Sequence, residues 1–290
     1  MAKSLARPYR SVLYIPASKA RALEKARDLA ADAIIFDLED AVAPEEKIRA
    51  RELLGEVLAG TDYGRRVRLV RVNGLGTEWV DGDLAAFRAH PGVDAVLLPK
   101  VNGPADLDAV AGRVQAPLWA MMETAKGCLN AGAIAAHPRL EGMVMGTNDL
   151  AKELGARHRS DRLPLMAALG ACVLAARAES KVIIDGVFNA FRDEAGLRAE
   201  CEQGRDMGFD GKTLIHPAQL DIANAVFAPS EEEVALARRM ISAYREARAR
   251  GEGVAVLDGR IVENLHVASA EALIGKAEAI AAESIAAAAE

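Results

Sequence analysis

The sequence has few cysteines and no long apolar run, and each shortage excludes a class of protein. Its 290 residues include 3 cysteines, at positions 128, 172 and 201. An odd number at wide spacing favours reduced thiols in the cytoplasm over a disulfide framework or a zinc site. No apolar run approaches the roughly 20 residues that a transmembrane helix needs. We therefore expect a cytoplasmic chain that is not held in a membrane.

Basic residues are outnumbered by acidic ones, 36 to 42. The formal net charge is −6 at pH 7, which argues against general binding to nucleic acids or anionic membranes. An acidic chain can still hold a local basic pocket, so a small anionic substrate is compatible with the composition. The start of the chain lacks the layout of a signal peptide. No G-x-G-x-x-G follows the first strand-like run, which lowers the expectation of a dinucleotide-binding sheet.

What the sequence does contain is an alternation of short apolar runs with helix-like segments. Strands are predicted at 11–17, 33–38, 67–73, 95–101, within 118–127, within 140–150, at 182–188 and at 211–215. Such alternation predicts a parallel sheet, and eight repeats that close on themselves form a (β/α)8 or TIM barrel. The expected fold class is therefore α/β.

The C-terminal part of the chain has a different pattern. It contains a charged helix at 231–250, two short strand-like pieces at 254–257 and 260–262, and then an alanine-rich helix. We expect a barrel domain at 1–228 and a C-terminal extension or lid at 229–290.

Two of the apolar runs end abruptly in an acidic residue, Glu123 and Asp149. Both carboxylates are expected at the C-terminal ends of strands, where α/β folds place their sites. Two hard oxygen ligands that converge there indicate a divalent cation, with Mg²⁺ as the expected ion. The alternative is that each acid merely caps the helix that follows.

Other polar residues follow the remaining strands and are expected at the same mouth of the barrel. They are Glu39, Asp40, Arg71, Asn73, Lys100, Asn148, Asp185 and His216. An unpaired Arg71 late in an apolar strand would be costly, so it needs a carboxylate partner. Either Glu39 or Asp40 pairs with it for stability, or Arg71 also grips an anionic substrate or a developing oxyanion. Lys100 and Asp185 are expected either in ion pairs at the barrel rim or in the site.

Several runs together resemble a known family. They are RSVLYIPASKARALEKA (10–26), IIFDLEDAVAPEEK (34–47), VRVNG (70–74), LPKV (98–101), METAKG (122–127), GTNDLA (146–151) and GKTLIHPAQ (211–219). In order and spacing they resemble the CitE-like branch of the HpcH/HpaI aldolase and citrate lyase superfamily, which includes malyl-CoA and citramalyl-CoA lyases. The resemblance implies a TIM barrel with a C-terminal extension, assembled as a homotrimer or homohexamer, that works with Mg²⁺ or Mn²⁺.

The resemblance also implies roles for residues at the mouth. Glu123 and Asp149 match the two protein ligands of the metal, with Asn148 expected to contact the substrate beside them. Arg71 matches the residue that binds the carboxylate or carbonyl oxygen of the substrate. Glu39 and Asp40 would orient Arg71 and the water on the metal.

Contacts with coenzyme A are implied at five further positions. Tyr14, Lys19, Lys25, Ile215 and His216 fall where the family contacts this part of its substrate. A lysine on a helix is most often a solvated charge, and this alternative applies most strongly to Lys25.

The sequence departs from the family pattern at the residue that transfers the proton. The family has an aspartate at the end of a D-G-K-M-I-D-like segment, often reaching a neighbouring subunit, and the matching run 258–263 ends in Glu263. Glutamate has a similar unperturbed pKa, but its extra methylene moves the carboxyl by roughly an ångström. The change is compatible with a shifted substrate, a slower lyase, or a loss of cleavage in favour of binding or thioester hydrolysis. His266 is either a substitute base or structural.

The leading hypothesis is a Mg²⁺-dependent lyase that cleaves or forms a 3-hydroxyacyl-CoA of the malyl-CoA or citramalyl-CoA type. The products would be acetyl-CoA and a 2-oxo acid, either glyoxylate or pyruvate, so the expected partners are a CoA thioester and a 2-oxo acid. Three alternatives stay open: a CoA-independent class II pyruvate aldolase, a malyl-CoA-type thioesterase, and a non-catalytic subunit that binds acyl-CoA.

Overall fold

The chain folds into two compact units. The computed structural model describes residues 7–287, and the side chains of residues 7–282. One unit is Tyr9–Phe227, and the other contains the residues from Ala228 onward. Each unit has its own apolar core.

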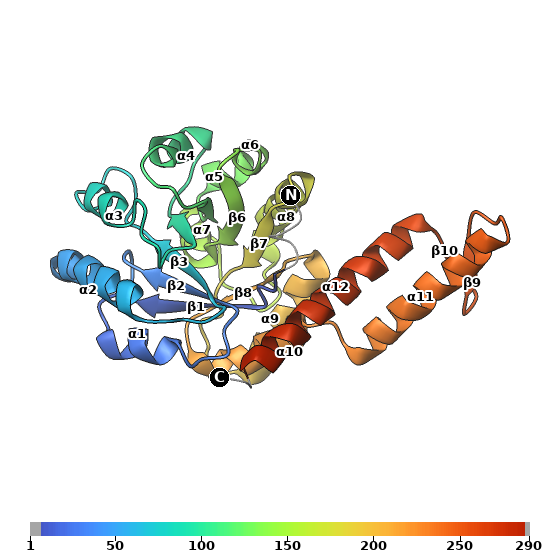
Figure 1. Ribbon diagram of the computed structural model, residues 1–290. Helices are drawn as coiled ribbons and strands as arrows, with labels where there is room; N and C mark the ends of the chain where they lie inside the picture. The colour runs from blue at the N-terminus through green and yellow to red at the C-terminus, as the bar shows by residue number, and fades with distance from the viewer. Residues whose placement is uncertain (1–6, 288–290) are drawn as a thin grey trace. The chain divides into compact units, whose positions relative to one another are not determined.

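The larger unit is a closed barrel of eight parallel strands in sequence order, with the last strand paired to the first (Figure 1). The strands are β1 (Ser11–Pro16), β2 (Ala33–Asp37), β3 (Val67–Arg71), β4 (Ala95–Leu98), β5 (Leu118–Met122), β6 (Leu140–Met145), β7 (Val182–Asp185) and β8 (Gly211–Leu214). This confirms the α/β class and the TIM barrel expected from the sequence.

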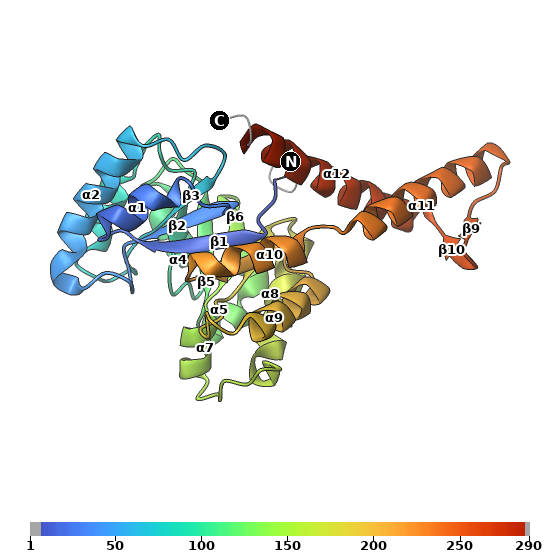
Figure 2. The ribbon, with the colours of Figure 1, turned by 90° about the horizontal axis from the view of Figure 1, so that it is seen from below.

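Helices surround these strands, as Figures 1 and 2 show from two directions. They are α1 (Ala20–Ala26), α2 (Lys47–Gly60), α3 (Val80–Ala86), α4 (Pro104–Ala111), α5 (Ala125–Leu129), α6 (Ala131–Ala135), α7 (Thr147–Glu153), α8 (Met166–Ala178), α9 (Glu194–Met207) and α10 (Leu220–Phe227). Short 3-10 turns precede α2, α8 and α10 at Pro44–Glu46, Leu163–Leu165 and Pro217–Gln219.

Several strands end earlier than the apolar runs suggested. β3 ends at Arg71 and β4 at Leu98, although Val72 and Val101 beyond them are still fully buried. Apolar character therefore continues into the loops, which pack against the barrel after the strand hydrogen bonds have ended. Pro99 has no N–H to continue the ladder after β4. As a result, polar residues predicted at strand ends lie in the loops of the mouth.

The barrel core has two layers that follow from the alternation of side chains along each strand. One set of residues fills the interior of the barrel, including Ile35, Leu69, Trp119 and Val144. A second, larger set packs between the strands and the helices. The interior Trp119 needs a glycine on the neighbouring strand, because a Cβ at Gly142 would lie 2.6 Å from its ring.

A buried ion network joins the strands to the helix layer. Asp185 lies 2.7 Å from Arg162 and 3.0 Å from Lys212, and Lys212 also lies 2.7 Å from Glu200 on α9. Asp185 and Lys212 are fully buried. Burial opposes ionisation, but Lys212 and Arg162 hold the pKa of Asp185 below its usual value. The ion pair expected for Asp185 is present, but its expected place at the barrel rim was wrong: because Ile184 points into the barrel, Asp185 points outward to α9.

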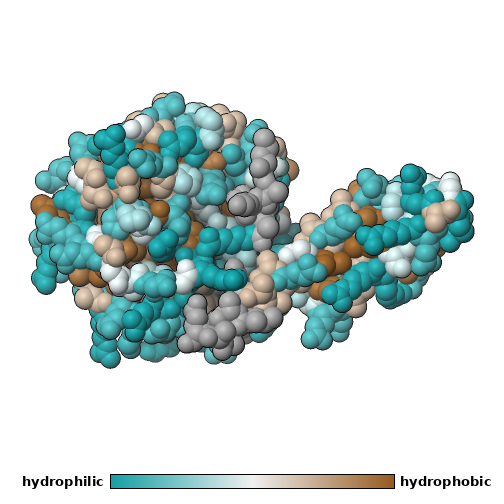
Figure 3. Space-filling model, viewed as in Figure 1, coloured by the Kyte–Doolittle hydropathy of each residue, from teal (hydrophilic) through white to brown (hydrophobic). Residues whose placement is uncertain are grey.

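The smaller unit is a helical hairpin with a two-stranded sheet. It contains α11 (Glu231–Ala249), β9 (Ala255–Leu257), the antiparallel β10 (Arg260–Val262) and α12 (Asn264–Ala287). Its visible face is mostly hydrophilic, with hydrophobic residues between the two helices (Figure 3). Within residues 7–287, we find no helix with the length and apolar character to span a bilayer.

The beginning of α12 bears on the two roles considered for His266. This residue lies in the first turn of the helix. Its Nδ1 accepts a hydrogen bond of 2.9 Å from the backbone N–H of Glu263. This contact satisfies an N–H at the helix start, which is a structural role.

Breaking the buried ion network should destabilise the barrel strongly. Lys212→Met keeps the side-chain volume but leaves Asp185 and Glu200 with a single buried cation, Arg162, so the free energy of unfolding should fall by about 3 kcal/mol. Urea denaturation of the purified variant measures this loss. The control is Arg113→Gln, which breaks the exposed Arg113–Asp81 pair and should change stability by less than about 1 kcal/mol. Equal effects of the two variants would contradict the account.

Candidate functional site

A cavity of about 330 Å³ lies at the C-terminal mouth of the barrel. Its walls come from loops and strand ends that are far apart in the sequence. They are formed by Tyr14, Asp37, Asp40, Ala41, Arg71, Met121, Glu123, Met145, Gly146, Thr147, Asn148, Asp149, Val187 and Ile215. The cavity therefore brings together Glu123, Asp149 and Arg71, the three residues on which the predicted site depended.

Arg71 is held by a carboxylate that the sequence reasoning missed. Its Nε and Nη2 donate to the two oxygens of Asp37 at 2.7 and 2.6 Å. The predicted partners are secondary: Nη1 lies 2.9 Å from Glu39 and 3.9 Å from Asp40. Asp37 and Arg71 are register partners on β2 and β3. That cross-strand position is the signal that could have identified the pair.

The buried guanidinium of Arg71 stays charged because of these acids. Burial alone disfavours the charged form, but Asp37, together with Tyr14 and Glu39, raises the pKa of Arg71 well above its usual value. The guanidinium also lies 5.0 Å from the centre of the Tyr14 ring, within cation–π range. The Tyr14 hydroxyl donates to the sulfur of Met121 at 3.4 Å, and burial raises the pKa of this phenol. Arg71 is therefore fixed in place on three sides.

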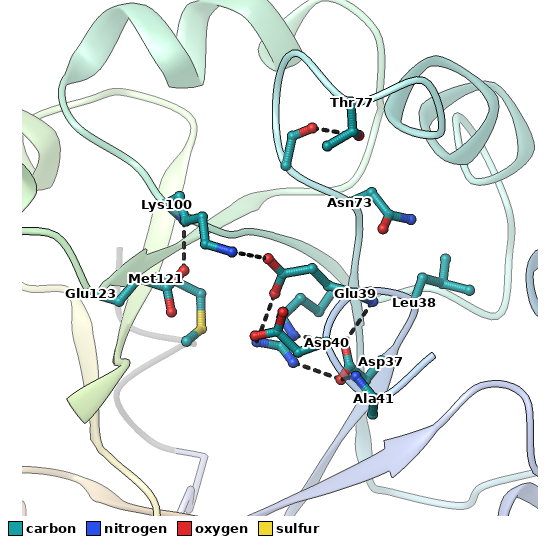
Figure 4. A network of polar contacts seen from close by, with 12 residues as sticks. Asp37, Leu38, Glu39, Asp40, Ala41, Asn73, Thr77, Lys100, Met121 and Glu123 are labelled. Carbon is teal, nitrogen blue, oxygen red and sulfur yellow. Dashed lines mark hydrogen bonds and ion pairs between the residues drawn. The ribbon is translucent and has the colours of Figure 1, made fainter. Parts of the chain in front are cut away.

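Glu123 is almost fully buried at the end of β5. Its Oε1 accepts a hydrogen bond of 2.7 Å from the backbone N–H of Lys100 (Figure 4). Within the described chain, Oε2 has no hydrogen-bond donor, and it faces the backbone of Gly146. Burial, reinforced by the charge of Glu39, raises the pKa of Glu123 to about 7, although the Lys100 N–H and Arg71 act in the opposite direction. This buried acid is poised to receive a cation.

The two acids do not simply cap helices. Thr124, not Glu123, caps α5, because its hydroxyl accepts the backbone N–H of Gly127 at 2.9 Å. Asp149 lies in the first turn of α7 and lines the cavity. The charge of Asp149 contributes to the raised pKa of Glu123. The two carboxylates therefore interact electrostatically.

Lys100 and Glu39 form an ion pair beside this cavity. Nζ of Lys100 lies 2.7 Å from Oε1 of Glu39. Figure 4 shows this contact as a dashed line. Burial raises the pKa of Glu39, against the effect of Arg71. The loop that carries Glu39 is held by Lys47 of α2, whose ammonium donates to the carbonyls of Leu38 and Glu39 at 2.9 and 2.8 Å. Lys47 was not predicted, because it lies within a helix of ordinary charged residues.

A second cavity of about 600 Å³ adjoins the same loops. Glu39, Asp40 and Lys100 line it, together with Asn73. Asn73 does not enter the first cavity. Its side chain instead donates to Asp83 of α3 at 2.7 Å, and burial raises the pKa of that aspartate. Asn73 therefore connects β3 to the helix layer.

Asn148 is exposed and bonded to another asparagine. It exchanges side-chain hydrogen bonds of 3.2 and 2.8 Å with Asn189, which follows β7. The pair joins the first turn of α7 to the loop after β7 at the mouth. Asn189 was missed by the sequence reasoning, because it follows the strand by four residues.

The residues expected to contact coenzyme A are not all in the cavity. Tyr14 and Ile215 line it, whereas Lys19 and Lys25 are exposed at the two ends of α1. His216 is exposed, and its ring stacks on Phe191 at 4.7 Å between ring centres. Its Nδ1 accepts the backbone N–H of Ala218, so part of its role is to cap the turn that begins there.

Glu263 belongs to the smaller unit, where it is exposed between β10 and α12. The described residues that line the cavity belong to the larger unit, and the role of Glu263 in proton transfer stays a prediction.

The donor set of the cavity fits a divalent cation held by few protein ligands. Among residues 7–287, no three His, Cys, Asp or Glu side chains cluster as a complete metal site. Four carboxylates nevertheless line the cavity, those of Asp37, Asp40, Glu123 and Asp149, against the single guanidinium of Arg71. A hard cation that takes one or two carboxylates and keeps other positions for water or substrate oxygens matches Mg²⁺.

Comparisons with known proteins agree on the family. The model of the HpcH/HpaI aldolase/citrate lyase family matches residues 10–217. A (3S)-malyl-CoA thioesterase of Cereibacter sphaeroides is 69% identical over 278 residues, which cover 96% of this chain and 97% of the relative. An L-malyl-CoA/beta-methylmalyl-CoA lyase of the same species is 36% identical over 310 residues, at the same coverage.

Solved structures agree as well. The crystal structure of CitE from Mycobacterium tuberculosis with magnesium, acetoacetate and coenzyme A superimposes with a TM-score of 0.80 and 31% identity, covering 94% of this chain and 99% of that one. A citrate lyase beta subunit from the same organism, complexed with oxaloacetate and magnesium, gives a TM-score of 0.70 and 32% identity, covering 78% and 100%. The neighbours thus bind magnesium and carboxylic acids.

Removing the charge of Glu123 should stabilise the cation-free protein in a pH-dependent way. The folded-state pKa of Glu123, about 7, exceeds its ordinary value of 4.5, so its contribution to stability is present below the ordinary value and is lost as the pH rises through 7. In a chelator, Glu123→Gln should therefore be more stable than the wild type by roughly 2–3 kcal/mol at about pH 8 and by little at about pH 4.

Urea denaturation across this pH range measures the difference. Glu179→Gln, at the exposed end of α8, is the matched control, because it removes a carboxylate charge without relieving burial. A difference between wild type and Glu123→Gln that does not grow with pH would contradict the raised pKa.

Proposed function

The chain belongs to the HpcH/HpaI aldolase/citrate lyase family, and from this premise we propose that it hydrolyses a malyl-CoA-type thioester. The products would be coenzyme A and the free hydroxy dicarboxylic acid. The observation that carries this proposal is the 69% identity, over nearly the whole of both chains, to a protein named (3S)-malyl-CoA thioesterase. This replaces carbon–carbon cleavage, the leading hypothesis from the sequence, with one of its alternatives.

The charge balance of the cavity supports a divalent cation, Mg²⁺ or Mn²⁺, held by Glu123 and Asp149. A substrate that carries a carboxylate would be repelled by the four acids, which one arginine cannot balance, unless further positive charge were present. When bound, the cation supplies that charge and polarises the substrate oxygens that it contacts. The free Oε2 of Glu123 is the oxygen available to it.

Arg71 is well placed to bind the substrate carboxylate. Asp37 and Glu39 fix its orientation, so little side-chain freedom is lost when an anion binds. A positioned guanidinium also stabilises an oxyanion that develops nearby. We propose that Glu39 orients Arg71. Asp40, which is exposed and lines the cavity, is the carboxylate that can take a proton from an entering water molecule.

The proposed reaction breaks the carbon–sulfur bond of the thioester. The oxygen of water forms a bond to the acyl carbon, the sulfur leaves as a thiolate, and a proton from that water ends on the thiol. No oxidant or further reactant is needed. The C–C bond next to the hydroxyl group, which a lyase would break, stays intact.

The coenzyme A part of the substrate is proposed to lie along the β1 and β8 side of the mouth. Tyr14 and Ile215 line the cavity there, and His216 with Phe191 offers an exposed aromatic stack nearby. The exposed Lys19 and Lys25 supply positive charge on α1 for phosphate groups. A homotrimer or homohexamer in the cytoplasm remains our prediction for the assembly.

The second candidate function is a lyase that forms acetyl-CoA and a 2-oxo acid. The observation in its favour is the 36% identity to an L-malyl-CoA/beta-methylmalyl-CoA lyase. Both reactions would use the same cation and Arg71. The lyase additionally needs a proton donor for the enolate, a role that we propose for Glu263 if cleavage occurs.

The products distinguish the two functions. Purified protein with Mg²⁺ should convert (3S)-malyl-CoA into equal amounts of free thiol and malate, because water attacks the thioester carbon. A thiol reagent and chromatography of the acids measure both products, and an excess of chelator should lower the rate at least about a hundredfold.

Acetyl-CoA and glyoxylate as the main products would overturn the thioesterase proposal in favour of the lyase. Glu263→Ala is the companion variant: under the thioesterase proposal it should keep hydrolysis within about threefold, whereas a lyase should lose at least about a hundredfold in cleavage rate.

The cation can be tested without activity. A Cβ at Gly146 would overlap with Cβ and Oε2 of Glu123, so Gly146→Ala should displace that carboxylate and weaken Mn²⁺ binding at least about tenfold. Calorimetric titration measures the affinity. The control is Gly132→Ala on the exposed surface of α6, where an added Cβ meets nothing within 4 Å. Unchanged affinity in Gly146→Ala would exclude Glu123 as a ligand.

A further inference from the structure

Lys100 has a backbone conformation that lysine rarely adopts. Its φ is 54°, in the left-handed region that favours glycine. It follows Pro99, directly after β4. This conformation directs its N–H to Oε1 of Glu123, at 2.7 Å. Strained residues of this kind persist where the surrounding structure holds them, commonly at functional sites.

The side chain of Lys100 reaches in a second direction. Nζ lies 2.7 Å from Oε1 of Glu39, and the other oxygen of Glu39 lies 2.9 Å from Nη1 of Arg71. Figure 4 shows Lys100 between Glu123 on one side and Glu39 on the other. A single residue thus connects the proposed cation ligand to the acid that contacts the proposed substrate-binding arginine.

Stability alone does not explain a lysine at this position. Glycine would present the same N–H without the strain of a left-handed side chain. The Lys100 side chain is 50% exposed and that of Glu39 is 8% exposed, but Glu39 keeps Arg71 as a buried partner without the lysine, so the Lys100–Glu39 pair adds little to stability. The pair also lines the second cavity, whereas Glu123 and Arg71 line the first.

We propose that Lys100 is a positioning residue for the reaction: its N–H orients Glu123 for the cation, and its ammonium holds Glu39 against Arg71. The kinetic part of this inference rests on the proposed thioesterase function. The parts that concern Mn²⁺ binding and the position of Glu39 do not rest on that function.

Lys100→Gly separates the two contacts, because it keeps the N–H and removes the ammonium. Turnover of (3S)-malyl-CoA should fall at least about tenfold while KM changes less than about threefold, since orientation in the transition state is lost rather than substrate binding. Mn²⁺ affinity should stay within about twofold, and the melting temperature should not fall, because strain is relieved.

Ser180→Gly is the matched control. Ser180 also has a left-handed backbone, with φ of 52°, and it is exposed between α8 and β7. This variant relieves the same kind of strain and should leave turnover unchanged. Lys100→Arg, which can still pair with Glu39, should keep turnover within about threefold of the wild type.

A double-mutant cycle tests whether Lys100 acts through Glu39. If it does, Lys100→Gly with Glu39→Gln should be no more than about twofold slower than the slower single variant. If the losses in turnover of the two single variants multiply in the double variant, the proposal is overturned.

A backbone ester tests the other contact of Lys100. Replacing the peptide bond before residue 100 with an ester removes the N–H and should weaken Mn²⁺ binding about tenfold. Unchanged affinity would overturn the backbone part.

The inference about Lys100 can be tested even if malyl-CoA is not the substrate. If the wild type hydrolyses no malyl-CoA-type thioester, the proposed function fails, and the Lys100 inference is decided by Mn²⁺ affinity and a crystal structure of Lys100→Gly. In that structure Glu39 should have moved away from Arg71. An unmoved Glu39 would overturn the inference even if the wild type is an active thioesterase.

Discussion

A buried guanidinium must be neutralised, and the rest of the mouth depends on how Arg71 meets this requirement. Asp37 lies opposite it in the barrel register and accepts two of its hydrogen bonds. Glu39 then approaches the remaining nitrogen, Lys100 approaches Glu39, and the backbone of Lys100 reaches Glu123. Alternating charges thus run across the mouth from β2 to β5. Each group is oriented by its neighbour, so Arg71 and Glu123 hold fixed positions before any substrate arrives.

The same network leaves the first cavity short of positive charge. Its single arginine is already paired with acids, while Glu123 and Asp149 line the same cavity and the charge of Asp149 adds to the raised pKa of Glu123. Burial makes the ionised form of Glu123 costly, as its raised pKa shows. Burying acids whose charge is not balanced lowers the stability of the fold. Such an arrangement is typical of a functional centre rather than of a stabilising ion network.

Much of this site could be predicted from the sequence, because strand C-termini of a barrel share one mouth. Glu123, Asp149 and Arg71 follow from that rule, and all three line one cavity. Asp37 was missed because its pairing depends on strand register. Asp185 was assigned to the rim because the inward or outward sense of β7 was not counted. The left-handed backbone of Lys100 depends on tertiary contacts and has no local signal. The sequence also could not decide between thioester hydrolysis and carbon–carbon cleavage, because the same cation and arginine are proposed for both reactions.

The central claim is that Glu123 and Asp149 together hold a divalent cation beside Arg71. Anomalous diffraction from a crystal soaked in Mn²⁺ tests it most directly. The account predicts one strong peak in the first cavity, with an oxygen of each acid at about 2.0–2.5 Å from the ion. A peak that lies elsewhere, or one that contacts only one of the two carboxylates, would contradict it.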